Sequence, residues 1–145
     1  MLLTETADQT FLLQYVKDYC EALAENYRIY HKRTLQGNLS GDYPEYAREQ
    51  LQAMEDGTAN LMRFRMQEGK KYYKVVQQEW DEDRQEYRDR SVNSFVDKKT
   101  GEVYKASSWK APAKGVRFDM RIMSHRAMMH DYKQVDWAGG HLYYR

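Results

Sequence analysis

Apolar side chains first recur at helical spacing in the N-terminal part of the chain. Over residues 8–35 the stripe consists of Leu12, Val16, Tyr19, Leu23, Tyr27 and Tyr30. This spacing of three and four residues predicts a long amphipathic helix. A second stripe over residues 44–68 predicts another helix, with Pro44 at its first position and Gly69 at its end. Gly57 interrupts that helix at its middle. Two helices joined by a short loop predict an antiparallel helical hairpin.

The pattern then changes to alternation, which predicts strands at residues 70–78, 91–97 and 102–109. Asp97 and Gly101 bracket the turn between the last two strands, because aspartate caps turns and glycine accepts a positive φ. The charged segment 79–90 is predicted to be a connector, either the end of a hairpin or a loop. Pro112 has no N–H group to donate, so it cannot continue a central strand.

After the strands, Asp119 is placed to cap a third helix over residues 120–134. The aromatic tail 135–145 either packs onto the core or serves as a docking element, and we favour packing. The predicted fold class is α+β: an N-terminal antiparallel helical hairpin packed on a three-stranded antiparallel β-meander, plus a C-terminal helix. Residues 1–145 are expected to form a single domain, with a helical half at 1–69 and the meander and C-terminal helix at 70–145.

The composition bears on whether the chain has a binding surface. The chain has 13 Tyr and 8 Met, residue types that suit either a thin core or a binding surface. Residues 1–69 hold 7 Lys or Arg against 11 Asp or Glu, whereas residues 70–145 hold 16 against 11. This asymmetry points to a basic face in the second half. No apolar run reaches the roughly 18 residues of a membrane span, so no membrane partner is expected.

Signals of catalysis are weak in this sequence. His125 and His130 are five residues apart, which does not give the paired ligands of a helical metal site. Asp81, Glu82 and Asp83 lack the glycine and the spacing of a calcium loop. The single Cys20 is expected to be buried and inert. We therefore predict no enzymatic activity, no cofactor and no metal.

A basic segment interleaved with aromatic residues is the stronger candidate. Phosphate contacts from Lys and Arg, with base stacking on aromatic rings, are typical of single-strand binding. Strand alternation places Lys105 and Tyr104 on opposite faces, however, and lysines on a hairpin edge also prevent aggregation. The predicted nucleic-acid or partner-binding residues are Lys98, Lys99, Lys105, Trp109, Lys110, Lys114, Arg117 and Arg121.

The segment 91–118 contains SVNSFVDKKTGEVYKASSWKAPAKGVRF. It resembles a recurrent segment of small, uncharacterised proteins of tailed bacteriophages. The resemblance implies a viral origin and a compact β-hairpin module, but it implies no activity. The predicted function is a phage accessory protein that binds nucleic acid or a nucleoprotein complex. The alternative is a protein-binding module: a host-directed or anti-defence inhibitor, or a minor virion component. We expect the host cytoplasm as its location, or the virion in the last case.

Overall fold

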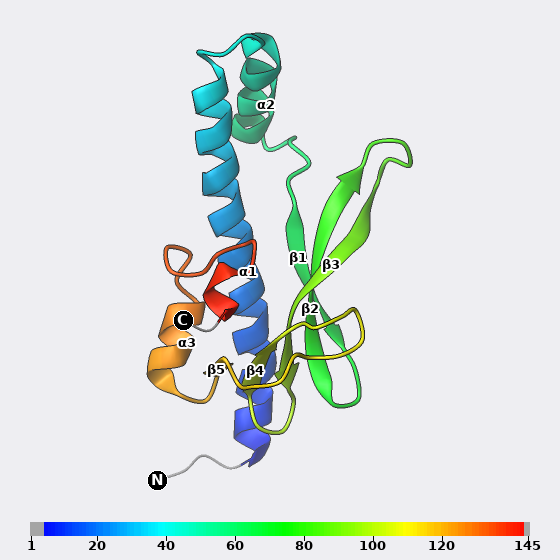
Figure 1. Cartoon of the computed structure of the whole chain (residues 1–145), viewed down its shortest axis with the longest axis vertical. Coiled ribbons are helices and arrows are strands. Elements are labelled where there is room, and N and C mark those ends of the chain that lie inside the picture. The colour runs from blue at the N-terminus through cyan, green and yellow to red at the C-terminus, as the bar shows by residue number, and fades with distance from the viewer. Residues whose placement is uncertain (1–4, 144–145) are drawn as a thin grey trace.

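Two helices open the structure, as predicted. The computed structural model describes residues 5–143, with side chains from residue 11 onward. Helix α1 spans Glu5–Asn38, and α2 spans Pro44–Asp56 beside the C-terminal end of α1 (Figure 1). The predicted long helix at 8–35 is therefore confirmed, and Pro44 does occupy the first turn of α2.

The prediction that the helix continues through the second half of residues 44–68 is wrong. Gly57 has a φ of 76° and ends α2, because its left-handed conformation lets N–H groups reach the carbonyls of Ala53 and Met54. Residues Arg63–Glu68 instead form strand β1, in which Phe64 is buried and Arg63 is exposed. The segment also satisfies the alternating pattern of a strand, and pairing with the next strand decides between the two patterns.

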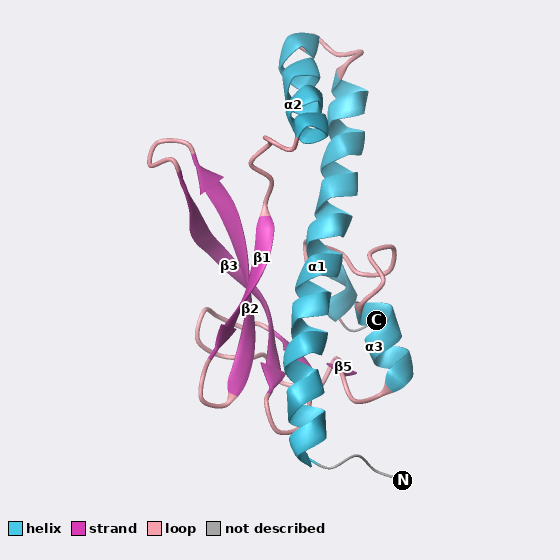
Figure 2. Ribbon diagram, turned by 180° about the vertical axis from the view of Figure 1, so that it is seen from behind, coloured by secondary structure: helices cyan, strands magenta, loops and turns pink. Residues whose placement is uncertain are grey.

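The sheet has five antiparallel strands in sequential order, where the sequence predicted three. The segment 79–90 is the end of the β2–β3 hairpin, whose tip projects away from the rest of the molecule (Figures 1 and 2). The predicted strand 102–109 is shorter than expected and ends at residue 105. After β1 the strands are β2 Tyr72–Asp81, β3 Glu86–Asp97, β4 Glu102–Lys105 and β5 Phe118–Asp119.

The turn between β3 and β4 has the predicted chemistry. The Asp97 carboxylate accepts the backbone N–H groups of Lys99 at 2.8 Å and Thr100 at 3.1 Å. Gly101 has a φ of 75°, and its N–H group donates to the Asp97 carbonyl at 2.8 Å. The side chain of Asp97 and the positive φ of Gly101 together fix the register of this hairpin.

The C-terminal helix is shorter than predicted. Helix α3 spans only Met123–Met129, with Ile122 rather than Asp119 at its N-cap. Asp119 belongs to β5, and its carboxylate accepts the N–H group of Arg121 at 2.9 Å in the turn before the helix. The tail packs onto the core over residues 135–143, as favoured: Leu142, at the end of the 3₁₀ helix Gly140–Leu142, is only 1% exposed. Residues 144–145 of the predicted tail lie outside the described residues.

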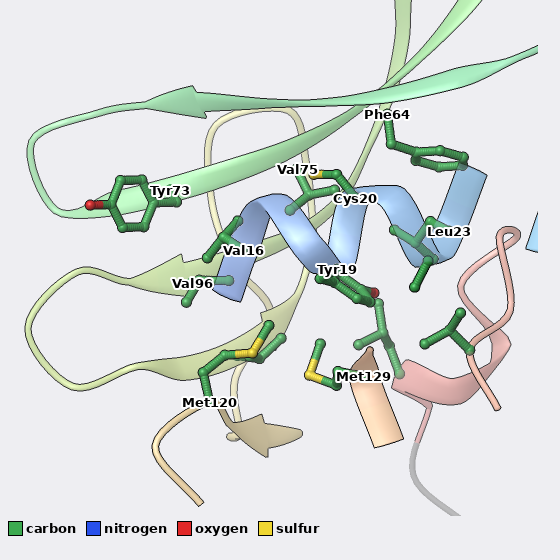
Figure 3. Close-up of a cluster of buried hydrophobic side chains, with 14 of the residues drawn as sticks. Val16, Tyr19, Cys20, Leu23, Phe64, Tyr73, Val75, Val96, Met120 and Met129 are labelled. Carbon is green, nitrogen blue, oxygen red and sulfur yellow. The ribbon is translucent and has the colours of Figure 1, made fainter. Parts of the chain in front are cut away.

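Helix α1 packs on the sheet, and α3 of the C-terminal segment lies on the side of α1 away from the sheet (Figures 1 and 2). The end of the tail turns back to β3 and β4, where Tyr143 lies beside Lys105. One hydrophobic cluster therefore joins all three parts (Figure 3). Its helical members come mainly from α1 and none from α2, so α1 rather than the whole helical hairpin covers the sheet. Its members include Val16, Tyr19 and Leu23 from α1, Phe64, Val75 and Val96 from the sheet, and Met120, Met129 and Leu142 from the C-terminal segment.

Two glycines with the same backbone conformation test the β3–β4 turn. A Cβ atom at Gly101 would lie 3.1 Å from Cγ of Arg121, whereas one at Gly57 would meet nothing within 4 Å. Gly57→Ala should cost about 1 kcal/mol, the strain of a left-handed alanine alone. Gly101→Ala should lower the free energy of unfolding by more, because it adds the steric contact. Urea denaturation of the two variants measures the difference, and equal losses would contradict the role of the contact.

Candidate functional site

The eight predicted binding residues do not form one surface. Lys98 forms an ion pair with Glu68 at 2.6 Å and donates to the Gly69 carbonyl at 3.0 Å. It thereby joins the β3–β4 turn to the β1–β2 turn. Lys99 and Lys114 are exposed, and they lie in separate loops.

The two arginines of the predicted set have structural contacts. Arg117 donates to the carbonyl of Leu142 at 2.6 Å and to that of Lys114 at 2.8 Å, which ties the tail to the segment before β5. Arg121 forms an ion pair with Asp119 at 3.1 Å. These contacts assign both guanidinium groups to local structure rather than to a shared binding surface.

Lys105 lies on the inner side of β4. It pairs with Ser94, which is buried, and its Nζ atom lies 4.7 Å from the centroid of the Tyr143 ring in the tail. Tyr104 pairs with Phe95 on the outer side, the face turned away from α1. Alternation therefore does separate Lys105 from the aromatic face of this strand, as the sequence indicated.

Trp109 and Lys110 belong to a different group, which we call the outer-face cluster. Here Nζ of Lys74 lies 5.4 Å from the Trp109 ring centroid and 5.5 Å from that of Phe95, within cation–π range of both. A neighbouring pocket of about 180 Å³ is lined by four lysines and no carboxylate. The cluster comprises Lys70, Lys71, Tyr72, Lys74, Phe95, Trp109 and Lys110.

Strand pairing explains how these side chains meet. Lys74 in β2 pairs with Phe95 in β3, so both side chains stand on the outer face. Tyr72 shares that face and contacts the Phe95 ring edge-on at 5.6 Å. The loop after β4 is closed by a bridge between Ala106 and Pro112, and its turn carries Trp109 to Lys74.

Sequence reasoning missed three of the four lysines. It concentrated on residues 91–121, whereas the other three lysines lie in the KKYYK segment: Lys70 and Lys71 in the turn before β2, and Lys74 within β2. Their signal was present: Lys70, Tyr72 and Lys74 are spaced by two, which places lysine and aromatic side chains on one face of a strand.

The electrostatics of the outer-face cluster favour anions. Among residues 11–143, whose side chains the structure describes, no carboxylate forms an ion pair with any of its four ammonium groups. Phe95 is only 2% exposed and serves as the floor, whereas Trp109 is 41% exposed and has ring surface available for stacking. Unpaired cations beside an exposed ring can bind phosphate groups and stack on a planar base.

A second cluster of polar side chains lies beneath the tail. The N–H group of Asp136 donates to Nδ1 of His141 at 3.0 Å, so the neutral ring carries its proton on Nε2. Nε2 then donates to the Tyr19 hydroxyl at 2.8 Å, and that hydroxyl donates to Oδ1 of Asn93 at 2.8 Å. Burial lowers the pKa of His141 to about 4, and it raises the pKa of Tyr19 well above its ordinary value.

This chain of hydrogen bonds makes stability depend on pH. The pKa of His141 falls from 6.5 in the unfolded chain to about 4 in the fold, so the unfolded state binds the proton more tightly. Stability from the neutral ring is complete above pH 6.5 and decreases as pH falls toward 4, by about 3 kcal/mol in all. Urea denaturation across this range should show the loss.

The control is His141→Gln, which removes the titrating ring. Its free energy of unfolding should vary less between pH 6.5 and 4.5 than that of the wild type. His31, whose pKa burial also lowers, contributes in the same direction and remains in both proteins. Parallel losses in the two proteins would show that His141 is not the cause.

The described part of the chain offers little for other kinds of site. The described side chains of residues 11–143 contain no group of three or more His, Cys, Asp or Glu placed to hold a metal ion. Burial raises the pKa of the Cys20 thiol to about 12, so this group is a protonated thiol at neutral pH. None of the described helices is long and apolar enough to cross a membrane.

Fold and site together define an α+β protein with a basic and aromatic face on its sheet. A family model described as "Family of unknown function (DUF7717)" matches residues 3–144. The chain therefore belongs to this family. No curated protein and no solved structure matches the chain.

Proposed function

We propose that this protein binds single-stranded nucleic acid through the outer-face cluster. The observation that carries the proposal is the pocket lined by four lysines beside the exposed ring of Trp109. None of these lysines is ion-paired among the side chains of residues 11–143. Unpaired cations keep their full attraction for phosphates, because no carboxylate competes with the ligand.

The arrangement suits a strand with unpaired bases. Trp109 presents one ring surface, and a base can stack on it only when that base has left a duplex. The ammonium group of Lys74 already lies within cation–π range of both Trp109 and Phe95, so it is held near the exposed Trp109 ring. Lys70, Lys71 and Lys110 surround the adjacent pocket, where they would contact successive phosphates.

The resemblance of residues 91–118 to segments of tailed-bacteriophage proteins supports an accessory role for this binding in phage infection. The ligand would then be single-stranded nucleic acid exposed during replication or repair, or a nucleoprotein complex that displays it. Stacking combined with phosphate contacts tolerates many sequences, so we expect little base preference.

Fluorescence anisotropy with a labelled oligothymidylate tests the proposal. The triple variant Lys71→Gln, Lys74→Gln and Lys110→Gln should bind more weakly, because it neutralises fewer phosphates. The slope of log K against log salt should become shallower by about 0.7 for each phosphate that the variant leaves unneutralised. Trp109→Ala should weaken binding by about 1–3 kcal/mol, the value of one stacked base.

The matched control removes the same number of charges from other surfaces, with Lys17→Gln, Lys32→Gln and Lys133→Gln, all exposed. It should retain most of the affinity. Absence of binding at about 50 mM salt, where phosphate contacts are strong, would overturn the proposal. Equal losses in the two triple variants would show that binding does not use this cluster.

A second candidate function, binding to a host or phage protein, has its own supporting observation. The projecting end of the helical hairpin carries Tyr43 at 82% exposure and Tyr46 at 61%. Tyrosine is enriched in protein interfaces. An inhibitor of a host complex, or a minor virion component, could use such a surface.

Affinity capture from cells of the natural host separates the two candidates. A protein partner should be recovered in equal proportion with the wild type and the triple lysine variant, and it should be lost with Tyr43→Ser combined with Tyr46→Ser. Capture that survives the tyrosine substitutions would rule out this surface as the interface.

A further inference from the structure

A second pocket, of about 140 Å³, lies at the edge of β3 on the side of the tail. It exists because β4 pairs with β3 only as far back as Ser94, so the preceding residues of β3 have no partner strand there. The tail approaches this open edge through the 3₁₀ helix and the residues around it. The pocket is lined by Gln77, Ser91, Val92, Asn93, Lys105, Ala106, Ala138, Gly139, Leu142 and Tyr143.

A β-bulge aims Asn93 toward this pocket. Val75 pairs with Ser94 and Val76 with Val92, so Asn93 is the extra residue between them. Its side chain is fixed, because Oδ1 accepts the hydrogen bond of Tyr19 at 2.8 Å. Asn93 is only 8% exposed, and its Nδ2 group has no acceptor among residues 11–143, whose side chains the structure describes. This amide donor is therefore available to a ligand or water in the pocket.

Lys105 adds a positive charge to the same pocket. Its Nζ atom lies 3.4 Å from the Ala106 carbonyl and 4.7 Å from the Tyr143 ring centroid, and both of those residues line the cavity. The ammonium group forms no ion pair with a described carboxylate. The Ser91 hydroxyl is another available donor, since its contact with Gln77 is long at 3.5 Å.

No lining residue is acidic. The nearby tail carboxylate of Asp136 accepts the N–H group of Ala138 at 2.9 Å within its own turn. The volume far exceeds the roughly 10–15 Å³ that one water molecule needs. The pocket thus combines one cation and two neutral donors with space for an ion of several atoms.

The geometry points to a binding site for a small oxyanion, the phosphate or carboxylate group of a metabolite. The ammonium group of Lys105 supplies the charge, while Nδ2 of Asn93 and the hydroxyl of Ser91 supply hydrogen bonds. The site is independent of the proposed nucleic-acid surface, because Lys105 and Tyr104 point to opposite faces of β4.

Two-dimensional ¹H–¹⁵N NMR of the full chain tests this inference, with inorganic phosphate and acetate as separate probes at constant ionic strength. The side-chain amide signals of Asn93 should shift and saturate with at least one of the two probes. Lys105→Met should weaken that binding at least about tenfold, as expected for loss of a charged hydrogen bond.

Two further variants complete the experiment. Asn93→Asp keeps the acceptor for Tyr19 but replaces the amide donor by a negative charge, so it should abolish binding, with the backbone signals of the pocket as the readout. Lys99→Met removes an exposed lysine from the β3–β4 turn and should bind as the wild type does.

Which probe saturates the Asn93 signals tells a phosphate site from a carboxylate site. No saturable shift with either probe would overturn the inference. A shift that Lys105→Met leaves unchanged would also overturn it, because the site would then lack its charge.

Discussion

The Tyr19 hydroxyl is the point where the three parts of the structure meet. The ring is fully buried on the inner face of α1, and a buried hydroxyl destabilises the fold unless it is hydrogen-bonded. One partner, Asn93, comes from the sheet, and the other, His141, comes from the tail. The packing of α1 therefore requires both the bulge in β3 and the docked tail. This hydrogen-bonded contact makes a helix, a sheet and a C-terminal segment mutually dependent.

This arrangement determines which surfaces remain for binding. Because α1 and the tail occupy the inner face of the sheet, the outer face beside Lys74 is left to the loop that carries Trp109. The loop is anchored by the hydrogen bond from the Ala113 N–H group to the Lys105 carbonyl at 2.7 Å. The lysines next to it form no ion pair with the described side chains of residues 11–143, so positive charge collects on the face of the sheet opposite the hydrophobic core.

Sequence patterns predicted the elements whose signals are local. The long period of α1 and the turn chemistry of Asp97 and Gly101 are encoded within a few residues, and both predictions are confirmed. Strand β1 was missed because its six residues fit both a helical and an alternating pattern. Only its pairing with β2 decides between them. Strand β5, of two residues, exists only through its pairing with β4 and had no sequence signal at all.

The difference between local signals and contacts made by strand pairing also applies to the candidate site. Trp109 and Lys110 could be selected from the sequence because they lie in an unusual basic segment. Their partner Lys74 comes from a strand two positions away in the sheet, and no pattern within one segment reports that neighbour. The eight predicted residues were grouped by their place in the sequence, whereas the sheet groups lysines by face.

Strand β4 shows how the sheet separates neighbouring side chains onto its two faces. Tyr104 and Lys105 are adjacent in the chain, yet one contacts Tyr72 on the outer face and the other lies beside Tyr143 under the tail. A shift of one residue in the pairing of β4 would exchange them, placing a lysine against buried Phe95 and a tyrosine in the polar pocket. The shift is unfavourable, because it would also turn Val103, which is fully buried in the core, toward the outer face. The burial of Val103 therefore holds the register that keeps the two polar sites apart.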